Sequence, residues 1–139
     1  MLEVINLNVS FFDRSKRNIF GKMPSIKVLE SINLKVEEGS TVGIVGESGS
    51  GKSTLGKAIL KLCDVDSGSI IYRDKDITDM KQTTFQAIRK ELQMIFQDPQ
   101  SSLNPRHRII RILTEPLLNF QICSTRKAAE DEAILLLNR

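Results

Sequence analysis

Eight residues from Gly46 to Ser53 carry the clearest chemical pattern in the sequence: glycine, four residues, glycine, lysine and serine. A chain that bends at Gly46, Gly49 and Gly51 can bring its backbone N–H groups close to an anion, because no Cβ stands in the way. Lys52 adds a positive charge, and the Ser53 hydroxyl can ligate Mg²⁺. This pattern, the Walker A motif, predicts a site for the phosphates of a nucleotide.

The segments on either side of this loop suit that chemistry. Residues 41–45 are almost continuously apolar and β-branched, which predicts a strand covered on both faces, as in a parallel sheet. Residues 52–62 place Leu55, Ile59 and Leu62 at helical spacing. A helix that begins near Lys52 would direct its unpaired N–H groups and the positive end of its dipole at the phosphates. A flexible glycine-rich linker would lack these neighbours.

A second polar group follows another apolar run. Residues 92–96 are predicted to form a second buried strand, which ends at Gln97, Asp98 and Pro99 because proline cannot continue it. A glutamine at the carboxyl end of such a strand lies where ligands bind in open α/β sheets, and its amide can contact a water or a metal ion. The residues alone leave two interpretations open: a sensor of the γ-phosphate, or an ordinary polar loop.

The remaining elements are expected around these two landmarks. Turn residues and hydrophobic periodicity predict strands over 2–9, 28–36 and 69–72, turns over 64–68 and 73–76, and helices over 84–91, 108–119 and 125–138. The last helix has Ser124 or Thr125 as its N-cap. The basic stretch 13–27 is predicted to be a long loop or an extended arm.

Composition narrows the class of protein. The chain has 139 residues, a formal net charge of +3 and 40% apolar residues, which argues against a disordered polymer and fits one domain or part of one. No apolar run is long enough for a membrane-spanning helix, and the N-terminus does not resemble a secretory signal. Two distant cysteines, Cys63 and Cys123, are expected to be reduced thiols. The small positive charge comes without a series of stacking aromatic residues, so a nucleic-acid partner is not expected.

The motifs together resemble a known family. The phosphate loop from Gly46 to Thr54, with the segment 96–99 and the run Ser-Leu-Asn-Pro-Arg at 102–106, is similar to the ATP-binding subunits of ABC transporters. The likeness is specifically to the oligopeptide, dipeptide and nickel importer branch, and it extends from residue 2 to about residue 137.

This resemblance implies an α/β fold, the N-terminal part of a P-loop NTPase core of the ABC ATPase type. An antiparallel β edge is expected over residues 2–36, and a helical subdomain is expected to start after Gln97. The whole of 1–139 would be a partial ABC ATP-binding domain. Its β subdomain and P-loop core would occupy 1–96, and the Q-loop with the start of the helical subdomain would occupy 97–139.

The resemblance also implies the ligands, ATP and Mg²⁺, and the residues that hold them. Phe11 corresponds to the aromatic residue that stacks on adenine, with Phe12 as the alternative, and Gln97 corresponds to the Q-loop glutamine. Ser53 and Gln97 would contact the metal. The implied nucleotide-binding residues are Phe11, Gly46, Glu47, Ser48, Gly49, Ser50, Gly51, Lys52, Ser53, Thr54 and Gln97.

The implied partners are transmembrane permease subunits, a second ATPase subunit and, indirectly, an extracytoplasmic solute-binding protein. The protein would lie peripherally on the cytoplasmic face of the cell membrane. The family also needs a signature motif, a Walker B strand, a catalytic glutamate and a switch histidine, and none is visible after Gln97. The only histidine, His107, is placed too early and is expected to be a solvated loop residue.

No catalytic residue is therefore assigned within the chain. We expect a chain truncated before the signature motif that binds ATP and hydrolyses little of it. Two alternatives stay open: a non-catalytic nucleotide-binding fragment that pairs with a full ATPase, and an unrelated small P-loop kinase or GTPase with Asp98 on Mg²⁺. Pro99 directly after Asp98, and the lack of an Asn-Lys-x-Asp motif, argue against the second alternative.

Overall fold

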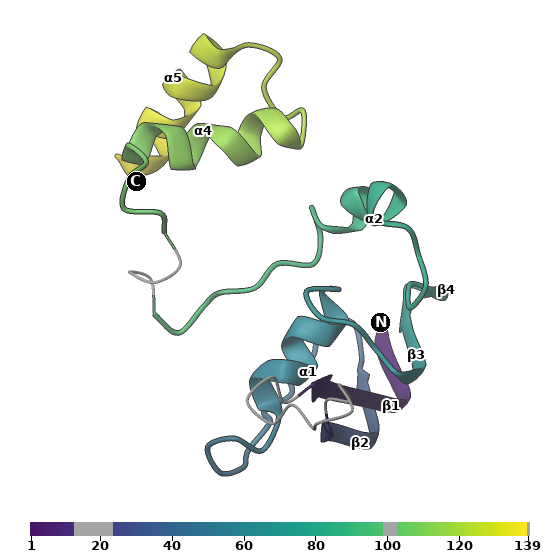
Figure 1. The fold of residues 1–139 in the computed structure, drawn as a ribbon. Coiled ribbons are helices and arrows are strands. Elements are labelled where there is room, and N and C mark those ends of the chain that lie inside the picture. Colours follow the sequence, from purple (N-terminus) through teal and green to yellow (C-terminus); the bar gives the residue numbers. More distant parts are fainter. Residues whose placement is uncertain (13–23, 99–102, 139) are drawn as a thin grey trace. The chain divides into compact units, whose positions relative to one another are not determined.

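The computed structural model describes residues 1–12, 24–98 and 103–138 (Figure 1). The chain divides into two compact units, Met1–Leu92 and Gln93–Arg139, and each is described by itself. The boundary after residue 96, between the β subdomain with the P-loop core and the segment with the Q-loop, stays a prediction.

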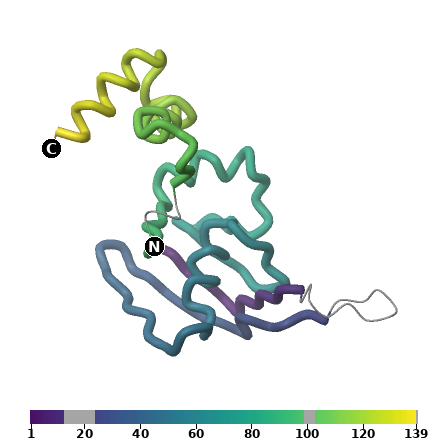
Figure 2. The backbone as a smooth tube through the Cα atoms, turned by 60° about the vertical axis from the view of Figure 1, so that its left-hand side comes forward, coloured from purple at the N-terminus to yellow at the C-terminus, as the bar shows by residue number. Residues whose placement is uncertain are grey.

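The first unit is built on an antiparallel sheet of four strands. In chain order these are β1 (Leu2–Phe12), β2 (Ser25–Val36), β3 (Ser67–Tyr72) and β4 (Lys75–Asp76), and their order across the sheet is β2-β1-β3-β4. In Figure 2 the long strands β1 and β2 run alongside each other in purple and dark blue. The antiparallel edge expected for residues 2–36 is thus confirmed. Residues 13–23 of the predicted arm lie outside the described residues, and residues 25–27 are not loop but the start of β2, paired with the end of β1.

Strand β1 does not alternate regularly between its two faces. Val4, Leu7 and Val9 are all buried, although Val4 and Leu7 are three residues apart. Between these two residues β1 advances by three positions while β2 advances by two, from Leu34 to Ile32. The extra residue forms a β-bulge, which returns Leu7 and Val9 to the face that Val4 occupies.

Two helices contribute side chains to the core beside this sheet. Helix α1 (Lys52–Ile59) buries Leu55 and Ala58, and helix α2 (Gln82–Ile88) buries Phe85. The predicted helix over 52–62 ends early, because Lys61 adopts a left-handed backbone with φ 53°. The core joins residues from all these elements: Val4, Leu7, Val9, Leu29, Leu55, Ala58, Ile70, Ile77 and Phe85.

The second unit contains two helices that pack against each other, α4 (Ile109–Asn119) and α5 (Arg126–Leu137) (Figure 1). The Thr125 hydroxyl accepts a hydrogen bond from the backbone N–H of Ala128 at 3.2 Å, so Thr125 is the N-cap, as predicted. Ala129 and Ala133 form the buried face of α5. Among the described residues, no helix has both the length and the apolar character needed to cross a membrane.

Two predicted strands are wrong. Residues 41–45 and 92–96 form no strand, and most of their apolar side chains are exposed, with Val45 98% and Ile95 97% accessible, although Leu92 packs against the core. A strand of the parallel type needs hydrogen-bonded neighbours and a cover on both faces. The part of the chain that the structure describes supplies no strand that pairs with either segment. The apolar pattern therefore predicts burial, but most of these side chains are exposed in this structure.

A hydrogen-bonded turn joins β4 to the core. The Asp76 carboxylate accepts hydrogen bonds from the Thr78 hydroxyl at 2.6 Å and from the Thr78 backbone N–H at 2.8 Å. The Thr78 hydroxyl in turn accepts from the backbone N–H of Ile70 at 2.7 Å. The hydroxyl bond from Thr78, and then the backbone bond, lower the pKa of Asp76 below its usual value because both favour the charged carboxylate.

We expect an Asp76→Asn substitution to lower the free energy of unfolding by about 0.5–1 kcal/mol at neutral pH, a discounted value because the carboxylate is exposed. A lowered native pKa contributes stability above the unfolded-state pKa of about 3.9, and this contribution is lost as pH falls through the native pKa. The gap between wild type and variant should therefore shrink on acidification. Urea unfolding from pH 7 to pH 3 measures it. Asp74→Asn, an exposed change in the turn between β3 and β4, should show no comparable gap, and a gap independent of pH would contradict the assignment.

Candidate phosphate-binding site

The glycine-rich segment forms a turn that leads directly into α1. The Ser50 backbone N–H donates to the Glu47 carbonyl oxygen at 3.2 Å, and the Leu55 N–H donates to the Gly51 carbonyl at 2.9 Å, which is the first bond of the helix. Gly51 is the N-cap and has a left-handed backbone with φ 91°. The loop therefore turns the chain at Gly51 and starts the helix at Lys52, as the sequence predicts.

Gly51 also lies against the neighbouring strand β2. A Cβ added to Gly51 would stand 2.9 Å from the carbonyl oxygen of Val28 and 2.7 Å from Cδ2 of Leu29. The Leu29 side chain could shift, but the Val28 carbonyl belongs to the backbone of a paired strand. A glycine is thus required at position 51 by its conformation and by its contact with β2. This contact fixes the end of the loop to the sheet.

The Lys52 ammonium group is held by the loop itself. Its Nζ donates to the backbone carbonyl of Gly46 at 2.7 Å, to that of Glu47 at 2.5 Å and to the Ser50 hydroxyl at 3.2 Å. The loop thus curls around the charge of its own lysine. Because all three partners are uncharged, the positive charge is not neutralised by a carboxylate in these bonds.

The N-terminus of α1 is open to an additional ligand. No side chain caps it, and no acidic residue lies in its first turn. The first N–H groups of a helix have no partner inside the helix, and they carry its positive dipole end. Ser53 is exposed there and Thr54 is half-buried. Backbone donors, one ammonium group and one hydroxyl therefore gather at one helix end, a donor set that suits an anion.

A cavity of about 300 Å³ lies between this loop and β2. Gly46, Ser50, Gly51 and Lys52 line its polar side, and apolar residues of β2 and α1 such as Leu29 and Leu55 line the other. In the described part of the chain, no group of three or more His, Cys, Asp or Glu side chains could form a metal centre.

The structure brings together the predicted residues 46–54 but not all the others. Phe11 stands near the end of β1 and is 43% exposed, and Phe12 is 69% exposed. Gln97 is an exposed residue of the second unit. His107 lies in the segment before α4, outside any helix or strand, and has intermediate exposure. The contact of β2 with Gly51 had no sequence signal, because it involves a backbone carbonyl.

Comparison with known proteins places this geometry in a family. The family model described as ABC transporter matches residues 29–138. The oligopeptide transport ATP-binding protein OppF of Salmonella typhimurium is 38% identical over 132 residues, which cover 94% of this chain and 40% of that protein. The dipeptide transport ATP-binding protein DppF of Lactococcus lactis subsp. cremoris is 41% identical over 141 residues, which cover 100% of this chain and 43% of that protein. The chain thus spans about two fifths of the length of these curated relatives.

Solved structures show the same fold. The dimeric bacterial ABC transporter cassette MJ0796 matches with a TM-score of 0.76 and 23% identity, over 99% of this chain and 56% of that one. The same cassette in a dimeric post-hydrolysis state, bound to ADP and Pi, matches with a TM-score of 0.75 and 24% identity. The expected fold, the N-terminal part of an ATP-binding cassette core, is confirmed, although its buried parallel strands are not formed by the described residues.

We expect Gly51→Ala to destabilise the protein by about 2–4 kcal/mol, because it combines a left-handed backbone with a backbone clash. Gly49→Ala is the matched control: Gly49 also has a positive φ, 84°, but nothing lies within 4 Å of the added Cβ. This control should cost only the conformational part, about 1–2 kcal/mol. Urea denaturation compares the two variants. Equal losses of stability would show that the contact between Gly51 and β2 does not constrain the loop.

Proposed function

The chain belongs to the ABC transporter family, and we propose that it binds ATP at residues 46–54 as part of the ATP-binding subunit of a peptide importer. The observation that carries this proposal is the arrangement of the phosphate loop, with Lys52 and an uncapped helix N-terminus at the same place. The backbone N–H groups would bind the β- and γ-phosphates, and the loop residues would wrap around them.

Lys52 would move little on binding. Its ammonium group already lies within the loop, where two carbonyl groups and a hydroxyl accept its hydrogen bonds. Phosphate oxygens carry negative charge, so they are stronger acceptors than these uncharged groups. ATP would therefore replace some of the bonds within the loop, and the loop would change from holding its own lysine to holding the nucleotide.

Ser53 is the residue of this loop that would hold Mg²⁺, through its hydroxyl group. Such an ion commonly binds through one or two protein ligands together with phosphate oxygens, which agrees with the lack of a preformed cluster of metal-binding side chains in the described residues. Held there, the ion would supply positive charge that offsets the negative charge of the phosphates. The proposed contact of Gln97 with the metal rests on the family resemblance.

The transport role is supported by the relatives. OppF of Salmonella typhimurium is named for oligopeptide transport and DppF of Lactococcus lactis for dipeptide transport. We propose that this chain serves an importer of the same kind, in which ATP binding and hydrolysis drive transport. Its partners would be the permease subunits, a second ATPase subunit and, indirectly, an extracytoplasmic solute-binding protein. Its place would be the cytoplasmic face of the membrane.

The binding site is tested with Lys52→Ala. Loss of a charge-assisted contact should weaken the affinity for ATP by about 10- to 100-fold. Titration of a fluorescent ATP analogue measures the affinity, and unlabelled ATP and GTP compete for the site. Lys57→Ala is the matched control, because Lys57 is an exposed lysine of the same helix that lies one turn beyond the loop.

Equal ATP affinity of the Lys52→Ala variant and the wild type would overturn the proposed site. Equal weakening by Lys57→Ala would show a general charge effect instead. Preference for GTP over ATP would favour the unrelated GTPase and count against the transporter role.

We infer that these 139 residues bind ATP without turning it over. Hydrolysis needs a positioned water and groups that stabilise charge on the γ-phosphoryl group, and no recognisable motif after Gln97 supplies them. At saturating MgATP we expect phosphate release at the level of the Lys52→Ala variant, which reports contaminating enzymes. Release well above that level would contradict the inference.

A further inference from the structure

Two asparagine side chains hold the irregular part of the sheet. Strand β1 carries one extra residue, Asn6, in its pairing with β2. The same residue is extra in the pairing with β3, where the paired residues change from Ile5–Ser69 to Asn8–Ser67. A compensating extra residue, Ser31, lies on β2 between Ile32 and Leu29. Asn6 and Ser31 both have a left-handed backbone, with φ 47° and 49°. A bulge leaves the backbone groups of its extra residue without ladder partners.

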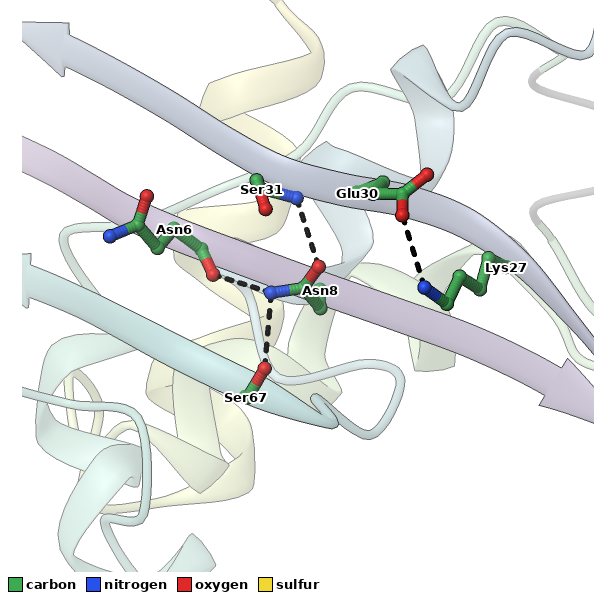
Figure 3. Close-up of polar contacts among 6 residues, drawn as sticks. All are labelled: Asn6, Asn8, Lys27, Glu30, Ser31 and Ser67. Carbon is green, nitrogen blue, oxygen red and sulfur yellow. Dashed lines mark hydrogen bonds and ion pairs between the residues drawn. The ribbon is translucent and has the colours of Figure 1, made fainter.

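Asn8 and Asn33 supply those partners. Asn8 Nδ2 donates to the Asn6 carbonyl at 2.7 Å, and its Oδ1 accepts from the Ser31 N–H at 2.9 Å (Figure 3). Asn33 does the reverse: its Oδ1 accepts from the Asn6 N–H at 2.9 Å and its Nδ2 donates to the Ser31 carbonyl at 3.0 Å. Both extra residues are therefore satisfied by one pair of amides.

Strand β3 also contacts the bulge. Asn8 Nδ2 also donates to the Ser67 hydroxyl at 3.0 Å (Figure 3). Gly68 has φ 100°, and a Cβ there would stand 2.5 Å from the Asn6 carbonyl oxygen, so only glycine permits this approach. Three strands thus hold the bulge at Asn6 in place.

The bulge decides which of two adjacent aromatic residues faces the core side of the sheet. Beyond it, Leu7 and Val9 are buried. The register shifts once more directly after Val9, but there β1 advances by one residue and β2 by two, so the extra residue lies on β2. Alternation along β1 therefore puts Phe11 on the face of Val9 and Phe12 on the opposite face. Without the extra residue, alternation from Val4 would put Phe12 there instead, because a one-residue slip exchanges the faces.

That face is the one on which the phosphate loop lies. Val9 pairs with Leu29, whose side chain approaches Gly51 at the start of α1. Phe11 follows Val9 by two residues, about 7 Å along the strand. Its ring is 43% exposed, which leaves it accessible to a flat apolar group.

We propose that Asn8, by holding the bulge at Asn6, is a positioning residue that selects Phe11 rather than Phe12 to contact the base of the bound nucleotide. This inference rests on the proposed ATP site and on the stacking role that the family resemblance implies for Phe11, and what it adds is the role of Asn8. A stacked ring contributes about 0.5–1.5 kcal/mol, and therefore a few-fold to tenfold in affinity.

The test compares ATP with inorganic tripolyphosphate, which has the phosphates but no base, in competition for the labelled nucleotide on the full chain. Wild type should bind ATP about 3- to 10-fold more tightly than tripolyphosphate. Phe11→Ala should remove most of this ratio, and Phe12→Ala should preserve it. Neither residue belongs to the buried core, so neither change threatens the fold.

Asn8→Ala should lower the ratio of ATP to tripolyphosphate affinity toward one while tripolyphosphate affinity stays unchanged. Circular dichroism establishes that the variant is folded at the assay temperature. Glu30→Ala is the control, because it removes the exposed Lys27–Glu30 ion pair beside the network (Figure 3) and touches none of its hydrogen bonds.

The outcomes separate the two proposals. A wild type that binds neither compound refutes the ATP site itself. If wild type binds both compounds equally, if Phe12→Ala rather than Phe11→Ala removes the ratio, or if Asn8→Ala weakens both ligands equally, the ATP site stands and the role of Asn8 is refuted.

Discussion

The contact between Gly51 and strand β2 is the constraint on which the site depends. The backbone of the loop meets the Val28 carbonyl and the Leu29 side chain at the point where α1 begins. Because β2 is paired with β1, and β1 with β3, the first turn of the helix is fixed to the whole sheet. The orientation of the N–H groups that would meet an anion is therefore set by the core of the first unit, through residues that are not part of the motif.

The loop keeps its form through its own polar groups. Lys52 bonds to Gly46, Glu47 and Ser50, so its charge shapes the turn that it would later share with phosphate. Side chains hold the backbone in a similar way in the sheet, where Asn8 and Asn33 supply hydrogen-bond partners to the backbone groups of Asn6 and Ser31. In both places a backbone without regular ladder bonds is held by polar side chains.

The antiparallel edge, most of the helices and the phosphate loop could be predicted because their signals are local. Alternating residues in β2, the Thr125 cap and the glycine spacing of the loop each depend on neighbours within a few positions. Residues 41–45 and 92–96 failed for the opposite reason. Their apolar character predicts a buried strand, yet a strand exists only where another strand pairs with it, and the described residues provide none.

The sequence by itself determined the phosphate-loop chemistry and the family, since both follow from residue types at fixed spacing. Only the tertiary structure decided how that chemistry is oriented. The left-handed Gly51 lies against the backbone of β2. At the bulge that exchanges the faces of Phe11 and Phe12, it is the backbone groups of Asn6 and Ser31 that the asparagine side chains bind. Main-chain carbonyls and N–H groups are the same in every residue, so contacts between them leave no mark in the sequence.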